Sequence, residues 1–174
     1  YSKNVHFVNV RGAFSEERYG DSYRNHREVE VLVEQLGRFV KDGRLIRGAE
    51  ARETRRPDNY TIAVLAPYAA QKTLLERTLR DKDMLGTFPG LEVSVNTIDG
   101  VQGMEKDAIF FSSTRSNPKG KLGFVADPRR TNVLLTRAKH NLVVVGDGAT
   151  LSASQSCWAN WMSWVRANGG LSDF

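Results

Sequence analysis

Short apolar runs rich in β-branched residues alternate along this chain with longer segments whose apolar residues recur at helical spacing. Parallel strands cannot be joined by tight turns, so such alternation favours a parallel sheet whose connecting helices cover it. We therefore predict an α/β domain with a mostly parallel sheet and helices on both faces. The expected strands are 5–10, 60–66, 91–98, 108–114 and 141–145, and the expected helices are 25–41, 71–80, 128–137 and 155–167.

The first predicted helix has a recognisable start. Asn25 is expected to cap it, and Glu28, three residues later, allows a capping-box interaction that holds the helix start. Gly43 is expected to end the helix. The charged segment 44–58 shows no periodicity and is predicted to be a loop, whose Arg-rich run 52–56 we interpret as solvated.

Length and composition fit a single domain covering residues 1–174, which is long enough to bury a sizeable core. The net charge of +5 permits a phosphate-rich partner without requiring one. A lone cysteine, Cys157, excludes a disulfide framework, and the three histidines are too scattered to suggest a metal site. We find no long apolar run and no signal-peptide pattern, so we expect an intracellular protein without a membrane partner.

The segment 91–107 joins a strand-like run to a loop that contains two glycines. Gly100 and Gly103 would let the backbone approach a phosphate closely, and Glu105 places an acceptor where a ribose hydroxyl could bind. A glycine-containing turn alone is weak evidence for a nucleotide site.

A second informative block is 127–140. Pro128 is suited to the first position of a helix, and three apolar residues, 133–135, supply its buried side. Arg137 then falls at the helix end, just before the predicted strand 141–145. An arginine held there can reach a ligand in a neighbouring cleft, as arginine fingers of nucleotide hydrolases do.

Together the two blocks resemble motifs V and VI of superfamily 1 helicases, in the version of the nonsense-mediated-decay (up-frameshift) type. Further matches are 65–71, which resembles motif IV, Asn25 with Glu28, the segment 123–130, and Trp158 in the last helix. These elements occur in the family's order and cover nearly the whole chain. The resemblance implies the second of two RecA-like domains of a P-loop NTPase motor.

The resemblance also implies two groups of site residues. One group would bind ATP, with Arg137 as the catalytic arginine at the γ-phosphate: Gly103, Glu105 and Arg137. The other would contact the backbone of single-stranded RNA or DNA: Pro67, Tyr68, Thr97, Asp99 and Gly100.

The chain lacks the phosphate loop and the strand-end Asp-Glu pair of such motors. We therefore expect it to be a fragment of a larger, monomeric helicase and to hold only half of an ATP site. The ligands of Mg²⁺, and the cradle for the phosphates of ATP, would come from the N-terminal RecA-like domain of the same protein. The isolated fragment would be inactive.

Structural readings compete for several of these residues. We favour Arg129 and Arg130 as partners of carboxylates such as Asp99 or Asp107, and we leave Tyr68 open between packing and contact. Three tryptophans at helical spacing are interpreted as core residues rather than a stacking surface: Trp158, Trp161 and Trp164. The alternative function is a non-catalytic RecA-like module that binds nucleic acid or protein, but such a module has no physical need for the three ATP-side residues.

Overall fold

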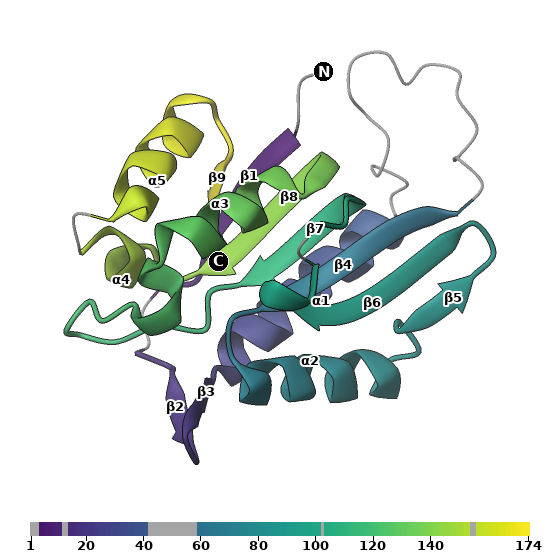
Figure 1. Ribbon diagram of the computed structural model, residues 1–174, viewed down its shortest axis with the longest axis horizontal. Coiled ribbons are helices and arrows are strands. Elements are labelled where there is room, and N and C mark those ends of the chain that lie inside the picture. Colours follow the sequence, from purple (N-terminus) through teal and green to yellow (C-terminus); the bar gives the residue numbers. More distant parts are fainter. Residues whose placement is uncertain (1–3, 12–13, 42–58, 102, 154–155) are drawn as a thin grey trace.

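The computed structural model describes residues 4–11, 14–41, 59–101, 103–153 and 156–174. Its centre is a seven-stranded sheet in the order β5-β6-β4-β7-β8-β1-β9 (Figure 1). Only the pairing of β5 with β6 is antiparallel within this sheet. The strands are β1 (Asn4–Asn9), β4 (Tyr60–Ala66), β5 (Gly86–Phe88), β6 (Leu91–Thr97), β7 (Lys106–Ser112), β8 (Ala138–Gly146) and β9 (Leu171–Asp173).

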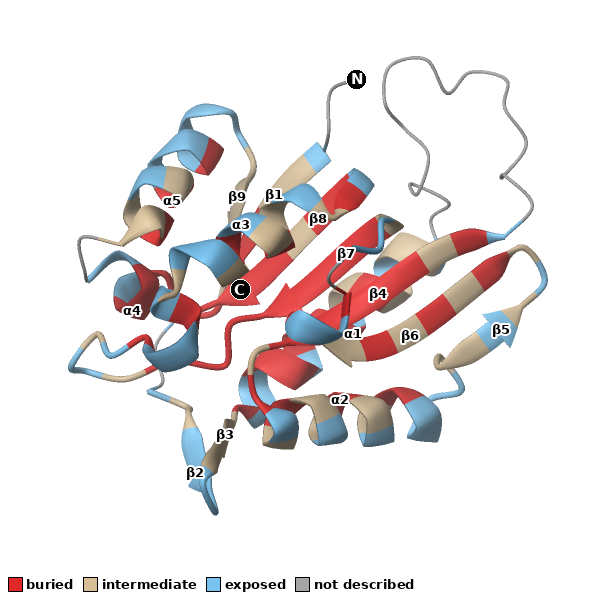
Figure 2. Cartoon of the chain, viewed as in Figure 1, coloured by how far each residue is buried: buried red, intermediate tan, exposed pale blue. Residues whose placement is uncertain are grey.

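Helices cover both faces of the sheet, which confirms the predicted α/β fold. One face packs against α1 (His26–Lys41) and α2 (Ala69–Asp81). The other face carries η2 (Asp99–Val101), η3 (Gly123–Ala126), α3 (Pro128–Thr136), α4 (Gly148–Ser152) and α5 (Cys157–Ala167). Figure 2 shows the central strands buried almost throughout, as strands covered on both faces must be.

Short elements were not predicted from the sequence. They are the antiparallel hairpin of β2 (Glu17–Tyr19) and β3 (Ser22–Arg24), the edge strands β5 and β9, and α4. Three-residue strands are too short to show a periodicity, so their partners determine them. The structure also starts α2 two residues before Gln71 and extends β8 back to Ala138, directly after α3. The predicted helix end at Gly43 and the loop 44–58 lie outside the described residues. No described helix has the length and apolar character to cross a membrane.

The start of α1 confirms the predicted cap but corrects the role of Glu28. The Asn25 side chain accepts a hydrogen bond from the Glu28 backbone N–H at 3.1 Å. The Glu28 carboxylate does not return to the Asn25 backbone as a capping box requires, because Gln71 Oε1 already accepts that N–H at 2.7 Å. It accepts instead from the Ser112 hydroxyl at 2.6 Å and the Thr114 N–H at 2.7 Å, at the carboxyl end of β7.

Thr114 shows what this carboxylate holds in place. The residue has a positive φ of 68°, which β-branched residues rarely adopt. Both of its backbone polar groups are bonded within the network, the N–H to Glu28 and the carbonyl to the Asn25 side chain. We call these five residues the buried polar network: Asn25, Glu28, Gln71, Ser112 and Thr114. The network joins the starts of α1 and α2 to the end of a central strand.

The buried polar network contains a fully buried carboxyl group with an unusual pKa. Burial raises the pKa of Glu28 from 4.5 to about 8, although hydrogen bonds from Ser112, Thr114 and Ser113 lower it in part. Between these two values the folded chain holds a proton that the unfolded chain releases. Stability from this group is therefore fully present below pH 4.5 and is lost as the pH rises through about 8.

We predict that the free energy of unfolding falls as the pH rises from 6.5 to about 8, by at most about 1.4 kcal/mol per pH unit. His6 acts in the opposite direction, because burial lowers its pKa, but its effect lies below its ordinary value of 6.5. Chemical denaturation at several pH values measures the slope. Glu28→Gln should flatten it, whereas the exposed Glu30→Gln on the same helix should leave it unchanged. Equal slopes in all three proteins would contradict the assignment.

Candidate functional site

The three residues predicted to face ATP are brought to one edge of the sheet. Glu105 directly precedes β7 and Arg137 directly precedes β8, and these two strands are parallel neighbours with Lys106 opposite Ala138. The backbone N–H of Lys106 donates to the Arg137 carbonyl at 3.0 Å. Gly103 lies two residues before Glu105, so segments from two distant parts of the sequence meet at the amino ends of β7 and β8. We call this place the amino edge.

Gly103 and Glu105 are both exposed at the amino edge. Gly103 has a φ of +80°, a conformation that side-chain-bearing residues rarely adopt. Among the described residues other than its chain neighbours, no atom lies within 4 Å of the place where its Cβ would stand, so conformation rather than crowding favours the glycine.

Arg137 ends α3 and keeps a free charge. It is the C-cap residue of the helix, and its Nε and Nη2 donate to the neighbouring Thr136 hydroxyl at 3.4 and 3.2 Å. Within the part of the chain that the structure describes, no carboxylate lies within 4.0 Å of its guanidinium. The guanidinium N–H groups that do not bond to Thr136 therefore remain available to an anionic ligand.

Residues predicted to contact nucleic acid lie at the opposite edge. Thr97 is the last residue of β6 and lies opposite Ala66, the last residue of β4, so Thr97 and Pro67 lie at the carboxyl ends of neighbouring strands. We call this place the carboxyl edge. The Thr97 hydroxyl accepts from the Gly100 N–H at 3.2 Å, which closes the turn into η2 and leaves Asp99 and Gly100 exposed.

The burial of Tyr68 corrects its prediction as a nucleic-acid contact. Only 4% of this residue is exposed, and its ring packs at 5.4 Å from the ring of Tyr23. Its hydroxyl donates to the Leu122 carbonyl at 3.4 Å and accepts from the Arg115 guanidinium at 3.1 Å. The choice left open from the sequence is thus decided in favour of packing, because the partners that bury the ring come from distant segments.

A buried ion pair supports Tyr68 and was not predicted. The Arg115 guanidinium donates to both carboxylate oxygens of Glu16, at 2.9 and 3.1 Å, and Arg115 is 5% exposed. Burial raises the pKa of Glu16, but hydrogen bonds from Arg115, Asn117 and Ser116 outweigh it, so the net pKa is lowered. The sequence carries no signal for this pair, because a polar run such as 112–117 after an apolar strand is equally typical of a surface loop and Glu16 lies 99 positions from Arg115.

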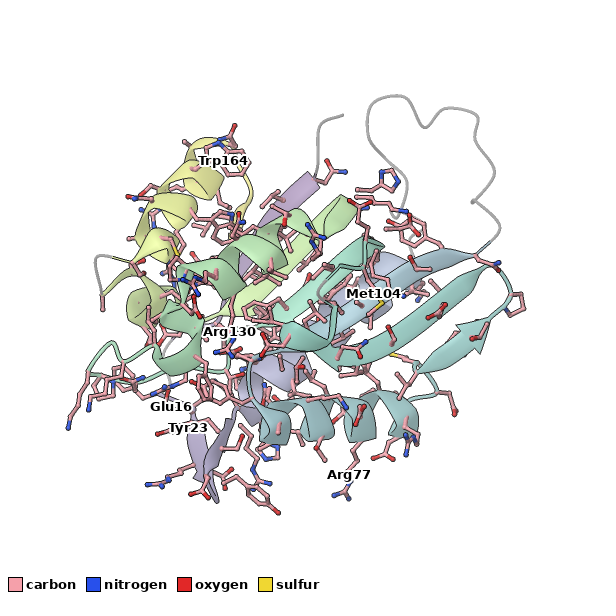
Figure 3. All side chains as sticks on the ribbon, viewed as in Figure 1. Glu16, Tyr23, Arg77, Met104, Arg130 and Trp164 are labelled. Carbon is pink, nitrogen blue, oxygen red and sulfur yellow. The ribbon has the colours of Figure 1, made fainter. Side chains whose placement is uncertain are left out.

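Arg130 links the two motif segments. Its Nε and Nη2 donate to the two carboxylate oxygens of Asp99 at 3.2 and 3.0 Å, which confirms the structural reading for this arginine (Figure 3). The hydrogen bond to Asp99 raises the pKa of Arg130. Arg129 is exposed and has no ion pair among the described residues. Asp107, the other partner considered, accepts from the Thr61 N–H and hydroxyl instead.

Two connections therefore run from the carboxyl edge to the amino edge on the same face of the sheet. One is the segment that follows β6, through η2 to Glu105, and the other is α3 with its C-cap residue Arg137 (Figure 1). The pair of Arg130 with Asp99 ties them together near the carboxyl edge, and the hydrogen bond between Lys106 and Arg137 ties them at the amino edge.

The tryptophans of α5 divide between core and surface. Trp158 is 1% exposed and donates its indole N–H to the Val125 carbonyl at 2.8 Å, which confirms its packing role. Trp161 is partly buried and packs edge-on against Phe7 and Trp158. Trp164 is 51% exposed, so the core prediction was wrong for this residue, which lies on the outer side of α5.

The predicted site residues lie outside the hollow that opens beside the amino edge and outside any metal-ligand cluster of the described residues. A hollow of about 1010 Å³ opens at the amino ends of β1 and β8, and its lining includes His6, Phe39 and Trp164 but none of the predicted site residues. The described residues contain no group of three or more His, Cys, Asp or Glu suited to a metal ion.

Comparison with known proteins gives a consistent result. A family model described as "AAA domain" matches residues 1–149. The chain is 33% identical over 177 aligned positions to the DNA polymerase alpha-associated DNA helicase A of Schizosaccharomyces pombe, covering 97% of this chain and 24% of that protein. It is 45% identical over 100 positions to the probable helicase MAGATAMA 3 of Arabidopsis thaliana (57% and 12% covered). It is also 36% identical over 132 positions to the regulator of nonsense transcripts 1 homolog of Neurospora crassa (76% and 11% covered). The chain thus spans a quarter or less of the length of these relatives.

We predict that Arg137→Ala changes the free energy of unfolding by no more than about 0.5 kcal/mol, because the substitution leaves no buried carboxylate of the described residues without its ion-pair partner. Arg115→Ala is the matched comparison. It should cost about 3 kcal/mol or more, since it leaves the Glu16 carboxylate unpaired in a largely buried place. Urea denaturation of the chain measures both. A loss for Arg137→Ala as large as that for Arg115→Ala would assign Arg137 to the structure rather than to a ligand.

Proposed function

The chain belongs to the AAA-domain family, as the C-terminal part of a superfamily 1 helicase, and on this premise we propose that it is the second motor domain of an intracellular ATP-dependent helicase. In this proposal its amino edge completes an ATP site formed mainly by the N-terminal RecA-like domain of the same protein. Its carboxyl edge forms one wall of a track for single-stranded RNA or DNA.

One observation carries the proposal: Arg137, with no carboxylate partner in the described part of the chain, directly precedes β8, and β8 pairs with the strand that follows Gly103 and Glu105 at the amino edge. Phosphoryl transfer spreads negative charge over the transferring group, and a planar guanidinium offers several donors to it at once. Arg137 would supply these donors, while Gly103 lets the backbone come close to a phosphate and Glu105 accepts from a ribose hydroxyl. A non-catalytic binding module gives no reason for these three groups to meet.

The residues at the amino edge do not fit a magnesium site of their own. Mg²⁺ needs oxygen ligands arranged around one point, and Glu105 is the only carboxylate among the three ATP-side residues. The ligands of Mg²⁺ are therefore assigned to the N-terminal domain. When bound there, the ion would neutralise phosphate charge, and this chain's part is to orient and stabilise through Arg137.

At the carboxyl edge, the proposed contacts are to the backbone of the nucleic acid. Three groups lie there at the ends of neighbouring strands: the hydroxyl of Thr97, the loop backbone at Gly100 and the rigid turn at Pro67. Asp99 would repel a phosphate if it were alone, but its pairing with Arg130 neutralises it. Contacts of this kind position a strand without reading its sequence.

We predict that Arg137→Ala in the full-length protein lowers kcat for ATP hydrolysis by roughly 10² or more, with little change in nucleotide affinity, because the arginine acts on charge that develops in the transition state. Arg137→Lys should recover little, since lysine lacks the planar fork of donors. Steady-state hydrolysis and equilibrium nucleotide binding measure the two effects.

The control for this experiment is Arg77→Ala, which removes an exposed arginine from α2 (Figure 3) and should leave kcat unchanged. A kcat for Arg137→Ala within a few-fold of the unmodified protein would contradict the role of Arg137. It would favour the non-catalytic module if the unmodified protein itself hydrolyses no ATP.

A further inference from the structure

Phe124 exposes a large aromatic ring at the carboxyl edge. The residue lies in η3, just before α3, and is 55% exposed. Its neighbours in η3 and the preceding turn behave differently, because Leu122 and Val125 are buried at 4% and 2% exposure. The side chains of Leu122 and Val125 thus point into the protein, whereas the Phe124 ring, which lies between them in the sequence, is exposed to solvent. A single exposed apolar residue is common, so its surroundings must decide whether the ring has a purpose.

Tyr68 contacts both the backbone and the ring of Phe124. The Tyr68 hydroxyl accepts a hydrogen bond from the Phe124 backbone N–H at 3.3 Å, and the two ring centroids are 5.4 Å apart. Gly123 has a φ of +58°, and a Cβ there would stand 2.4 Å from the Tyr68 hydroxyl and 2.5 Å from the Arg115 guanidinium. The backbone can approach this closely only because residue 123 is a glycine. The loop is therefore anchored on the buried unit of Tyr68, Arg115 and Glu16.

A second contact places Phe124 next to the proposed track. The Arg130 guanidinium carbon lies 5.2 Å from the centroid of the Phe124 ring, and the same guanidinium is held by Asp99. Asp99 and Gly100 belong to the turn that the proposed function assigns to the nucleic-acid backbone. The adjacent Arg129 is exposed and has no ion pair within the described chain. An aromatic face, a backbone turn and a free cation thus lie together at one edge.

We propose that Phe124 is a base-stacking residue for single-stranded nucleic acid, and that Tyr68 is the positioning residue that holds its ring in place. Every base has a flat π-face, so a fixed aromatic ring binds single strands with little sequence preference. The inference rests on the proposed function, because it extends the track at the carboxyl edge. It also gives a reason for a tyrosine at position 68, which is buried and cannot itself meet a base.

The test uses the full-length protein and two fluorescein-labelled 12-nucleotide strands, one of uridines and one in which a central block carries abasic sugars. Fluorescence anisotropy measures both dissociation constants. Phe124→Ala should weaken binding of the uridine strand by about 5-fold or more, which corresponds to the loss of one stacked base. It should leave binding of the abasic strand unchanged, because that strand has no base to stack there.

Three further variants separate stacking from folding. Phe124→Trp keeps a flat ring and should bind the uridine strand as the unmodified protein does. Tyr68→Phe keeps the buried ring but loses the hydroxyl that accepts from the Phe124 N–H, so it should lose part of the affinity for the uridine strand only. Trp164→Ala removes an exposed aromatic ring of α5, remote from the carboxyl edge (Figure 3), and should change neither constant.

The outcomes distinguish the inference from the function on which it rests. If the unmodified protein binds neither strand, the proposed track itself fails. If it binds and Phe124→Ala binds the uridine strand equally well, the stacking role is overturned while the track survives. Equal losses on the uridine and abasic strands would show that Phe124 acts through the fold and would overturn the inference as well.

Discussion

Parallel strand pairing is the constraint on which the rest of this structure depends. Because β4, β6, β7, β8 and β1 all run in one direction, each connection from one of these strands to the next along the chain must return from the carboxyl edge to the amino edge. The segment after β6 and the helix α3 are two such crossings on one face. Each begins beside the proposed track and ends beside the proposed ATP site, so the topology itself provides two physical links between the two edges.

Buried carboxyl groups hold the carboxyl edge in shape. Glu28 bonds to the end of β7 and holds Thr114 at a φ of 68°, while Glu16 pairs with Arg115 beneath Tyr68. Burying a carboxyl group costs free energy, so these groups contribute by fixing the positions of their partners rather than by adding much stability. Each carboxyl group accepts hydrogen bonds from several donors at defined places. The exposed residues of this edge, Thr97 and Phe124 among them, are therefore carried on backbone that is fixed from inside.

Local patterns predicted the elements, and long-range contacts decided the details of the site. The central strands were predictable because apolar β-branched runs mark buried strands, and the pairing of Arg130 was predictable as one of two options. The burial of Tyr68 was not, since the groups that cover it lie 45 to 56 positions away in the sequence. The partners of Glu28 were hidden for the same reason: they lie 84 to 86 positions further along the chain.

The central claim is that the two edges of one sheet serve two different ligands. Hydrogen exchange in the full-length protein tests it most directly, with a non-hydrolysable ATP analogue and a single strand added separately. The account predicts that the analogue slows exchange in residues 103–106 and around Arg137, and that the strand slows exchange in residues 97–101 and 123–125. Protection of the same edge by both ligands, or of neither edge by either, would contradict it.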